Sequence, residues 1–363
     1  MSRVVLKFGG SSVGDNTNYF DDNHIIRIAN TIKEQKEMGN QVVVVVSAMA
    51  GETRKLKEMA QNIDKISRKE EDDMILSVGE QISIGLLSKL LNSDKFNQKA
   101  KAFLGWQLPI ITDNVFGEAK IIDIRTSEIE KCLENDIIPI VAGFQGVTKN
   151  GRITTLGFDG SDTTAVALAG YINADWCYFY KDVRGVYTAN PRRVKKASKI
   201  DELSLKEMYV LSSLGARILH PVSIKIAMDH NINLRVLPNF LDKEEGTIIE
   251  NNCKERKISG ITYFEHKPNE ITISVVGNSV LQSDGEKIIK ELNKNKIFAQ
   301  IVNTEFDDMS ITVEIGWIEQ LDTALAAIHT LYNLDNEYEV RCSFNGEGKQ
   351  IYKDPAVTSS TGI

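Results

Sequence analysis

The sequence has few cysteines, and their spacing does not suit a metal site. Only four occur in 363 residues, at Cys132, Cys177, Cys253 and Cys342, and no two of them form a CxxC pair. Structural zinc sites and disulfide frameworks use closely or regularly spaced cysteines, so we expect neither. The simplest interpretation is four separate thiols in a reducing compartment.

The sequence also lacks an excess of positive charge and lacks long apolar runs. Its formal net charge is −7, so no broad basic face is available to neutralise the phosphates of a nucleic acid. No run approaches the ~20 apolar residues of a membrane helix. The opening segment MSRVVLKFGG has neither a long apolar core nor a cleavage site. We therefore expect a cytoplasmic protein with no nucleic-acid partner and no membrane partner.

The first two thirds of the chain alternate between strand and helix patterns. Residues 41–46 (QVVVVV) are apolar at nearly every position, which is typical of a strand buried on both faces of a parallel sheet. The other predicted strands are 3–8, 137–142 and 175–180, and the predicted helices are 23–38, 73–92, 126–134, 161–172 and 204–213. This alternation predicts an α/β sandwich with a mainly parallel central sheet.

The pattern changes after about residue 245, where a polar segment precedes a compact second module. The predicted strands of this module are 270–276, 297–303, 309–315 and 337–343, and its predicted helices are 283–294 and 318–332. The order β-α-β-β-α-β is the ferredoxin-like arrangement. We divide the chain into a first domain at 1–245, a linker and connecting strand at 246–268, a second domain at 269–345 and a disordered tail at 346–363.

The first candidate for ligand binding follows the opening strand. Lys7 and Phe8 are followed by Gly9, Gly10 and Ser11. Glycines let the backbone approach a phosphate closely, and exposed N–H groups can hold its oxygens. A lysine beside them can neutralise charge on a transferring phosphoryl group. A tight turn with an incidental lysine explains the same residues equally well.

Two further segments suit a small polar substrate. SAMAGET (47–53) follows the valine-rich strand and carries the hydroxyls of Ser47 and Thr53; ligands of open α/β sheets bind beyond the carboxyl ends of the strands. In SVGEQIS (77–83), Glu80 could hold an ammonium group of a substrate. The plainer interpretations are a capped turn for the first segment and a solvated helix glutamate for the second.

A fourth segment, TTLGFDGSDTTA (154–165), leads from glycines and hydroxyls into a helix of small residues. We expect Ser161 to be the N-cap and Asp162 to lie in the first turn, where the helix dipole favours anions. Asp162 could orient the lysine or a metal. A simple capped helix is the alternative.

Two more segments carry candidate nucleotide contacts. YKDVRGVYTANPRR (180–193) offers Asp182, Tyr187 and Arg192 to a nucleotide, or else it forms a solvated basic loop. LGARILHP (214–221) contains Arg217 and His220. We interpret His220 as a helix-terminal or core histidine rather than a catalytic one.

Taken together, these six motifs resemble the aspartokinases, a branch of the amino-acid kinase fold. They occur in the order found in that family, with GWQ at 105–107 and VAGFQG at 141–146 as supporting segments, and the resemblance covers about residues 3–240. It implies an amino-acid kinase αβα sandwich. It also implies transfer of the γ-phosphate of ATP, with Mg²⁺, to the β-carboxylate of L-aspartate, the entry step to lysine, threonine and methionine synthesis.

The resemblance further implies roles for the matching residues, with Lys7 and Asp162 catalytic. The phosphates would be held by Lys7, Gly9, Gly10 and Ser11. Ser161 and Asp162 would sit at the junction of the substrate and the phosphates, with Ser161 also contacting the phosphates. The nucleotide would be lined by Asp182, Tyr187 and Arg192, with Arg217 where the family usually has a lysine that contacts the ATP phosphates. Aspartate would be held by Ser47, Thr53 and Glu80, with Glu80 facing its ammonium group.

The C-terminal module is similar to an ACT domain. Aspartokinases usually carry two such domains, and one full module fits here. Small sheets of this kind have exposed edges that invite pairing, so we expect a homo-oligomer formed through this domain. Its first strand-to-helix loop lacks the Pro-Gly pattern of effector-binding ACT loops, which leaves feedback control by lysine or threonine open.

The sequence departs from the family at Phe158-Asp159, where Arg-Gly is usual. That arginine is expected to pair with a carboxylate of aspartate, and losing such a pair could cost about 2–5 kcal/mol. Arg152 or Arg54 could compensate. Three alternatives remain: a kinase acting on another carboxylate, a catalytically weak regulatory protein that binds a metabolite, and a dinucleotide-dependent dehydrogenase. The last is poorly supported because the first glycine loop lacks GxGxxG.

Overall fold

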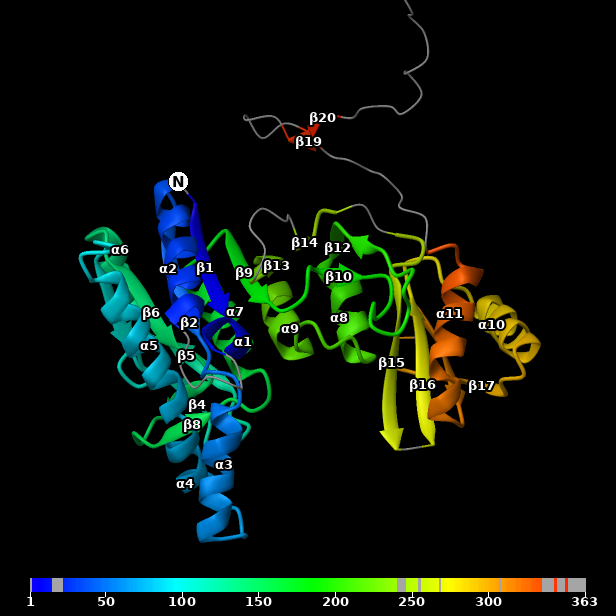
Figure 1. Cartoon of the computed structure of the whole chain (residues 1–363), viewed down its shortest axis with the longest axis horizontal. Coiled ribbons are helices and arrows are strands. Elements are labelled where there is room, and N and C mark those ends of the chain that lie inside the picture. Colours follow the sequence, from blue (N-terminus) through cyan, green and yellow to red (C-terminus); the bar gives the residue numbers. More distant parts are fainter. Residues whose placement is uncertain are drawn as a thin grey trace, which may run out of the picture.

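The computed structural model describes residues 2–14, 22–239, 246–253, 256–267, 269–306 and 308–334, together with 343–344 and 350–351. Two domains lie side by side along the long axis of the molecule, the first drawn from blue to green and the second in yellow and orange (Figure 1). The predicted strand 337–343 and the predicted tail 346–363 fall outside the described residues, except for the short pair β19 (Ser343–Phe344) and β20 (Gln350–Ile351).

The first domain is built on an eight-stranded sheet whose strand order is β12-β14-β13-β9-β1-β2-β6-β3. In that order the strands are Glu202–Ser204, Thr247–Glu250, Asn233–Pro238, Trp176–Lys181, Arg3–Phe8, Gln41–Val46, Ile138–Ala142 and Ala100–Phe103. Strands β13 and β14 pair antiparallel, whereas the other neighbouring strands of this sheet run parallel. The predicted mainly parallel sheet is therefore confirmed.

Helices cover both faces of this sheet. Successive side chains of a strand point to opposite faces. Accordingly, Val43 and Val45 pack into one hydrophobic cluster while Val42, Val44 and Val46 pack into the other. The first cluster includes residues of α6 (Ser127–Glu134), α7 (Gly160–Tyr171), α8 (Leu205–Ser213) and α9 (Pro221–His230). The second includes residues of α1 (Gly10–Val13), α2 (Asp22–Glu37) and α5 (Val78–Leu91). This is the αβα sandwich that the sequence predicts.

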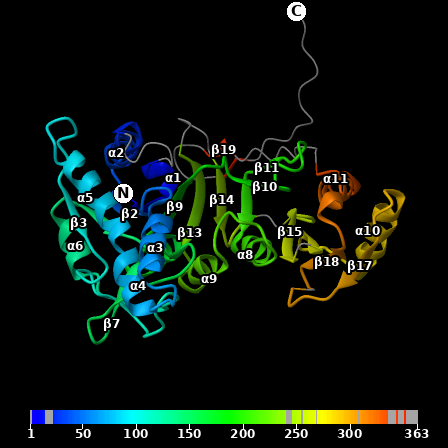
Figure 2. The same cartoon turned by 60° about the horizontal axis from the view of Figure 1, so that its bottom comes forward.

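Several short elements were not predicted from the sequence. A second sheet has the strand order β5-β4-β7-β8, which are Ile121–Ile124, Ile110–Thr112, Gln145–Thr148 and Ile153–Thr155. A two-stranded ribbon joins β10 (Val186–Tyr187) to β11 (Lys199–Ile200). The predicted helix 73–92 is divided at Ser77 into α4 (Lys69–Leu76) and α5, and α3 (Glu52–Ile63) precedes it. Figure 1 shows α3 and α4 beside each other at one end of the domain, and Figure 2 shows the same two helices from another side.

One stretch in the described part of the chain, Lys69–Leu91, is long and apolar enough to cross a membrane by length and composition alone. The sequence analysis did not expect such a stretch. Leu87 and Leu91 are buried in the hydrophobic cluster under the large sheet, and Asp73 and Glu80 are buried within the first domain. This stretch therefore contributes to the core of the first domain, where its apolar side chains have protein partners.

The second domain is a four-stranded antiparallel sheet with two helices. Its strand order is β15-β16-β18-β17, which are Gly260–Lys267, Glu270–Val276, Ser310–Ile315 and Ala299–Val302. Helices α10 (Gln282–Lys294) and α11 (Leu321–Leu331) cover it, with the short 3-10 turn Ile318–Gln320 leading into α11. Buried Ile288 and Leu292 of α10 and Leu325 and Ile328 of α11 share one hydrophobic cluster with the strands.

The segment predicted as a linker and connecting strand, 246–268, contains two strands in the described part of the chain. Strand β14 lies within it and belongs to the large sheet, and β15 lies within it and belongs to the small sheet. Glu207 of α8 fixes the connection, because its Oε1 accepts hydrogen bonds from Ser259 Oγ (2.6 Å) and the Arg256 backbone N–H (3.2 Å). Burial of Ile249 on β14 and of Ile261 on β15 stabilises these two strands in their sheets.

Candidate active site

The candidate residues converge because four parallel strands end at the same edge of the large sheet. Strands β9, β1, β2 and β6 are consecutive in the sheet, and the predicted motifs follow their carboxyl ends. Backbone hydrogen bonds continue this alignment past the strands, from Ser47 N–H to the Phe8 carbonyl (3.1 Å) and from Gly143 N–H to the Val46 carbonyl (3.0 Å). The carboxyl edge of an open α/β sheet is where such folds bind ligands.

The glycine turn after β1 packs directly against the loop after β2. A Cβ atom at Gly10 would lie 2.9 Å from the Ala48 carbonyl oxygen, so only glycine allows this approach without a shift. The Ala50 N–H donates to the Gly10 carbonyl (3.2 Å). The side chain of Ser12 is buried and donates to the Tyr180 carbonyl (3.3 Å), which connects the turn to β9. Ser11, in contrast, is exposed.

A cluster of three charged side chains lies beside this turn. Asp162 is fully buried, and its two oxygens each face an ammonium group: Oδ1 lies 2.5 Å from Lys7 Nζ, and Oδ2 lies 2.7 Å from Lys181 Nζ. Burial opposes ionisation of Asp162 most strongly, but the two lysines together outweigh it and hold its pKa below the usual value. Asp162 is therefore an anion, and it fixes the positions of both lysine head groups.

Helix α7 carries Asp162 into this position. The predicted N-cap at Ser161 is wrong: the helix begins at Gly160, and the carbonyl of Asp159 accepts from the N–H groups of Asp162 (2.9 Å) and Thr163 (3.3 Å). The helix starts earlier because Asp159 adopts a left-handed conformation, with φ of 53°, which short polar side chains tolerate. Asp162 therefore points from the first turn into the site, as predicted.

Glu80 is buried on α5, and only one of its two carboxyl oxygens has a hydrogen-bond partner. Its Oε1 accepts a hydrogen bond from the Ala48 backbone N–H (3.0 Å), and its Oε2 is buried without a hydrogen-bond partner. Burial is the main cause that raises the pKa of Glu80 to about 8, although the Ala48 bond and the Lys7 ammonium act in the opposite direction. A cationic group of a ligand would satisfy the free oxygen and restore ionisation.

Buried polar contacts hold the loops around Glu80. Asp73 accepts from the Thr155 hydroxyl (2.6 Å), the Thr155 N–H (2.8 Å) and the Gly117 N–H (2.9 Å). Gln145 donates to the Ser77 carbonyl (2.9 Å) and accepts from the Gly105 N–H (3.1 Å). These bonds connect helices α4 and α5 to the small second sheet and so position Glu80. The remaining substrate candidates, Ser47 and Thr53, are half-buried.

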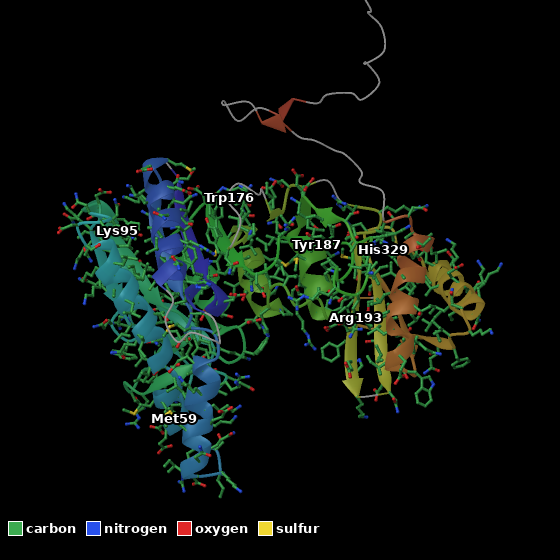
Figure 3. All side chains as sticks on the ribbon, viewed as in Figure 1. Met59, Lys95, Trp176, Tyr187, Arg193 and His329 are labelled. Carbon is green, nitrogen blue, oxygen red and sulfur yellow. The ribbon has the colours of Figure 1, made fainter. Side chains whose placement is uncertain are left out.

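The predicted nucleotide segment extends from the site toward the second domain. Asp182 and Arg192 are exposed, and Tyr187 is half-buried in β10. The Thr188 hydroxyl lies 2.9 Å from His329 Nε2, and Arg193 lies within 2.6 Å of Asp322 and within 2.9 Å of the Tyr263 hydroxyl. Figure 3 labels Tyr187, Arg193 and His329 in this region. The segment therefore contacts helix α11 and strand β15 as well as the first domain.

The other predicted residues are placed as follows. Arg217 is exposed before α9. His220 is the N-cap of α9, and its Nδ1 accepts from the Val222 N–H (3.3 Å), so the prediction of a helix-terminal histidine is confirmed. A Cβ atom at Gly143 would lie 2.7 Å from Ser161 Oγ, which places buried Ser161 against the end of β6.

The departure at Phe158 is visible in the structure. The Phe158 side chain is 81% exposed, and its ring centroid lies 6.5 Å from that of His220. The two arginines considered as substitutes are exposed and face other carboxylates: Arg152 is paired with Glu70, and Arg54 Nε lies 4.0 Å from Glu58. Neither Arg152 nor Arg54 is therefore positioned as a replacement for the missing arginine in this conformation.

The structure also identifies residues to which the sequence analysis gave no role. Lys181 is the clearest case, since it ends β9 beside β1 and contacts Asp162. The available signal was its position directly after the predicted strand 175–180, although the sequence does not show that this strand lies beside β1. Asp73 lies in the acidic run KEEDD, which is typical of a solvated helix face, and no pattern distinguishes it from its neighbours.

Comparison with known proteins now identifies the family. Residues 2–238 match the amino acid kinase family. The chain is 39% identical over 371 residues to an aspartokinase of Bacillus sp. (strain MGA3), covering 100% of this chain and 86% of that protein. The chain belongs to the aspartokinases of the amino acid kinase family. It is also 43% identical over 276 residues to aspartokinase 2 of Bacillus subtilis (strain 168), covering 75% of this chain and 65% of that protein.

Solved structures of the family support the fold. E. coli aspartokinase III in complex with aspartate and ADP has a TM-score of 0.76 at 18% identity, covering 90% of this chain and 99% of that chain. Aspartate kinase from Synechocystis has a TM-score of 0.60 at 32% identity, covering 92% of this chain and 56% of that chain. The resemblance drawn from the six motifs is confirmed at the level of family and fold. The individual site roles stay predictions.

Proposed function

We propose that the chain is an aspartate kinase, which transfers the γ-phosphate of ATP to the β-carboxylate of L-aspartate. The observation that carries this proposal is the Lys7–Asp162 ion pair beside the glycine turn, at the sheet edge where Glu80 keeps a free buried oxygen. The cation suits a phosphoryl group and the free carboxylate oxygen suits an α-ammonium group. The E. coli relative that shares the fold was solved with aspartate and ADP.

The geometry supports a direct transfer. An oxygen of the ionised β-carboxylate attacks the γ-phosphorus, the new O–P bond forms, and the bond to the bridging oxygen of ADP breaks with its electron pair leaving on ADP. Phosphoryl transfer depends mainly on positioning and on charge stabilisation. Lys7 supplies positive charge to the phosphoryl oxygens, and Asp162 keeps its ammonium in place. Glu80 orients the amino acid so that the β-carboxylate reaches phosphorus.

Magnesium would enter this site with the nucleotide. Among the described residues, no group of three or more His, Cys, Asp or Glu side chains could hold a metal ion. Mg²⁺ commonly keeps several waters and binds through substrate phosphates with one or two carboxylates. Asp182 is exposed at the end of β9 and is the residue we assign to such a contact. The ion would add charge neutralisation on the phosphates.

We further propose that the chain pairs with a second copy through its C-terminal domain. Strands β15 and β17 are the edges of the four-stranded sheet, and such edges favour strand pairing. Phe298, next to β17, is 80% exposed, and Ile301 on β17 is 44% exposed. A second copy would cover these apolar side chains.

We also place the protein in the cytoplasm, since the thiols of Cys132, Cys177 and Cys253 are free.

A second candidate function follows from Phe158. Its exposed apolar ring stands where the family has an arginine, so the chain could phosphorylate a carboxylic acid other than aspartate. A panel of aspartate, glutamate and related acids, each tested for ATP-dependent turnover, separates the two candidates. Turnover of another acid without turnover of aspartate would replace the first proposal with the second.

The deciding experiment is hydroxylamine trapping of the acyl phosphate with ATP and aspartate, for the wild-type chain and for Phe158→Arg. We expect trapped product from the wild type and an aspartate KM about tenfold lower in the variant, equivalent to about 1.4 kcal/mol. The reason is the restored arginine–carboxylate pair. Val222→Arg, at another exposed apolar position, is the control and should leave KM unchanged. Absence of trapped product from both the wild type and Phe158→Arg would refute the proposal.

A further inference from the structure

In the charged cluster of Lys7, Lys181 and Asp162, two ammonium groups contact one carboxylate. Lys7 and Lys181 each lie within hydrogen-bond distance of one oxygen of the same fully buried carboxylate. One ammonium group neutralises one carboxylate, so the three side chains together carry a charge of +1. A buried carboxylate needs a partner because an unpaired buried charge is costly. Either lysine alone would meet that need.

The two lysines come from adjacent parallel strands and contact different oxygens of Asp162, Lys7 at Oδ1 and Lys181 at Oδ2. Strands β1 and β9 pair in register, with Lys7 beside Phe179, and Lys181 is the last residue of β9. The Lys7 side chain is 7% exposed and the Lys181 side chain is 16% exposed. Lys181 is thus the more accessible of the two, and it lies within the predicted nucleotide segment 180–193, next to Asp182.

An excess positive charge with little access to water favours an anionic ligand. Water solvates an ammonium group poorly at such a position, so the cluster gains from any anion that replaces the missing solvent. Two other carboxyls interact with this cluster, Glu80 with Lys7 and Asp159 with both lysines. Burial raises the pKa of both, that of Glu80 to about 8, so Glu80 is largely uncharged at neutral pH. Asp162 is the carboxylate in direct contact with both ammonium groups, so a second anion supplied by a ligand would still stabilise them.

We propose that Lys181 is a second catalytic cation, which contacts the terminal phosphoryl group of ATP together with Lys7. This role rests on the proposed kinase activity and extends it. Lys181 stays protonated throughout: as the carboxylate oxygen bonds to phosphorus and the ADP oxygen departs with its electron pair, the two ammonium groups lie against the phosphoryl oxygens. Asp162 holds both lysines at a fixed separation, so charge stabilisation needs no rearrangement during transfer.

Two variants of Lys181 test this role. Lys181→Met removes the charge and keeps the length of the side chain. Lys181→Gln removes the charge but can still donate a hydrogen bond to Asp162, so it preserves the fold if the methionine variant unfolds. Lys36→Met is the control, because Lys36 is also partly buried, at 20% exposure, and pairs with the single carboxylate of Asp136 on a different part of the domain. Thermal unfolding is recorded for every variant.

The measurements are kcat and KM for ATP and aspartate, and the affinities of ATP and AMP by calorimetry. We expect both Lys181 variants to lose about 100-fold in kcat, as for removal of one charge-stabilising donor. We also expect about tenfold weaker ATP binding with AMP binding unchanged. Lys36→Met should match the wild type in kcat and in both affinities. Comparing the affinities of ATP and AMP isolates the contribution of the terminal phosphates. If Lys181 only supported the fold, its replacement would weaken the binding of both nucleotides equally.

Three results would overturn the proposal. The first is a Lys181→Gln variant with wild-type kcat and a wild-type ratio of ATP to AMP affinity. The second is an equal loss of both nucleotides with a lower unfolding temperature, which would mean that Lys181 only supports the fold. The third is a change confined to the KM for aspartate, which would assign Lys181 to the acid substrate. If the wild type phosphorylates no acid, the kinase proposal fails, while the ATP and AMP affinities still decide the role of Lys181.

Discussion

Replacement of Glu80 by glutamine offers the sharpest test of the substrate site. The ordinary pKa of this carboxyl is 4.5, and burial raises it to about 8 in the folded chain. A difference of about 3.5 pH units corresponds to about 5 kcal/mol, at ~1.36 kcal/mol per pH unit. Water that reaches the ionised carboxylate offsets part of this cost, so we expect the free energy of unfolding to change by about 3 kcal/mol over this pH range.

The sign follows from proton binding. Between pH 4.5 and about 8 the folded chain keeps the Glu80 proton, whereas the unfolded chain has lost it. The folded state therefore binds more protons, and stability falls as pH rises through this window. The contribution is fully present below pH 4.5 and is lost above about pH 8. Glu80→Gln does not titrate, so denaturant unfolding should show the variant gaining stability relative to the wild type as pH rises from 5 to 8.5.

The same proton couples to substrate binding. With a pKa of about 8, about one tenth of Glu80 is ionised at pH 7 and about three quarters at pH 8.5. Only the ionised carboxylate of Glu80 can form an ion pair with the ammonium group of aspartate. The aspartate KM of the wild type should therefore fall about eightfold from pH 7 to 8.5, and calorimetry in two buffers should show about 0.9 proton released per aspartate bound at pH 7. Glu80→Gln should raise KM and remove this pH dependence.

Glu207→Gln is the matched control for Glu80. Glu207 is also fully buried, but both of its oxygens accept hydrogen bonds, with Ser204 N–H (2.8 Å) and Ser204 Oγ (2.7 Å) on Oε2. This variant should lose stability by about 1–3 kcal/mol, because a buried acceptor is replaced, and should keep the wild-type pH dependence of KM. An aspartate KM that is flat with pH in the wild type, with no proton release, would refute the assignment of Glu80 to the ammonium group.

Two further predictions concern the glycine turn and the C-terminal domain. Gly10→Ala should raise the KM for ATP by about tenfold or more, because its Cβ would lie 2.9 Å from the Ala48 carbonyl oxygen and displace the turn; Gly85→Ala, which has no atom within 4 Å, should have wild-type kinetics. Sedimentation should show a wild-type dimer that Phe298→Asp dissociates and that Met38→Asp, at another exposed site, leaves intact. An unchanged ATP KM, or a monomeric wild type, would contradict these predictions.

The sequence predicted the parts of the fold that depend on continuous apolar patterns. Strands β1 and β2 are apolar on both faces, and the large sheet indeed buries both faces. The small sheet was missed because its strands have only three or four residues and include polar ones such as Gln145 and Thr155. Their burial depends on hydrogen bonds to distant residues, among them Asp73, and local sequence carries no sign of that.

In the candidate site, likewise, some features were predictable from the sequence and others were not. Lys7 and Asp162 were both found from glycine-rich motifs at strand and helix ends. Their contact depends on the order of strands in the sheet, which places β9 beside β1 and which the sequence alone does not define. Lys181 was passed over for this reason, since only the adjacency of these two strands brings its ammonium to Asp162.

Unused bonding capacity separates the functional carboxylates of this chain from the structural ones. Asp73 and Glu207 are as buried as Glu80, yet their oxygens are engaged by several protein donors, so a ligand could offer them little. Glu80 leaves one buried oxygen free, and Asp162 carries an extra cation. A folded chain gains nothing from either feature by itself, because both raise the free energy of the ligand-free state. An amino acid and a nucleotide phosphate together remove both costs, one supplying the missing cation and the other the missing anion.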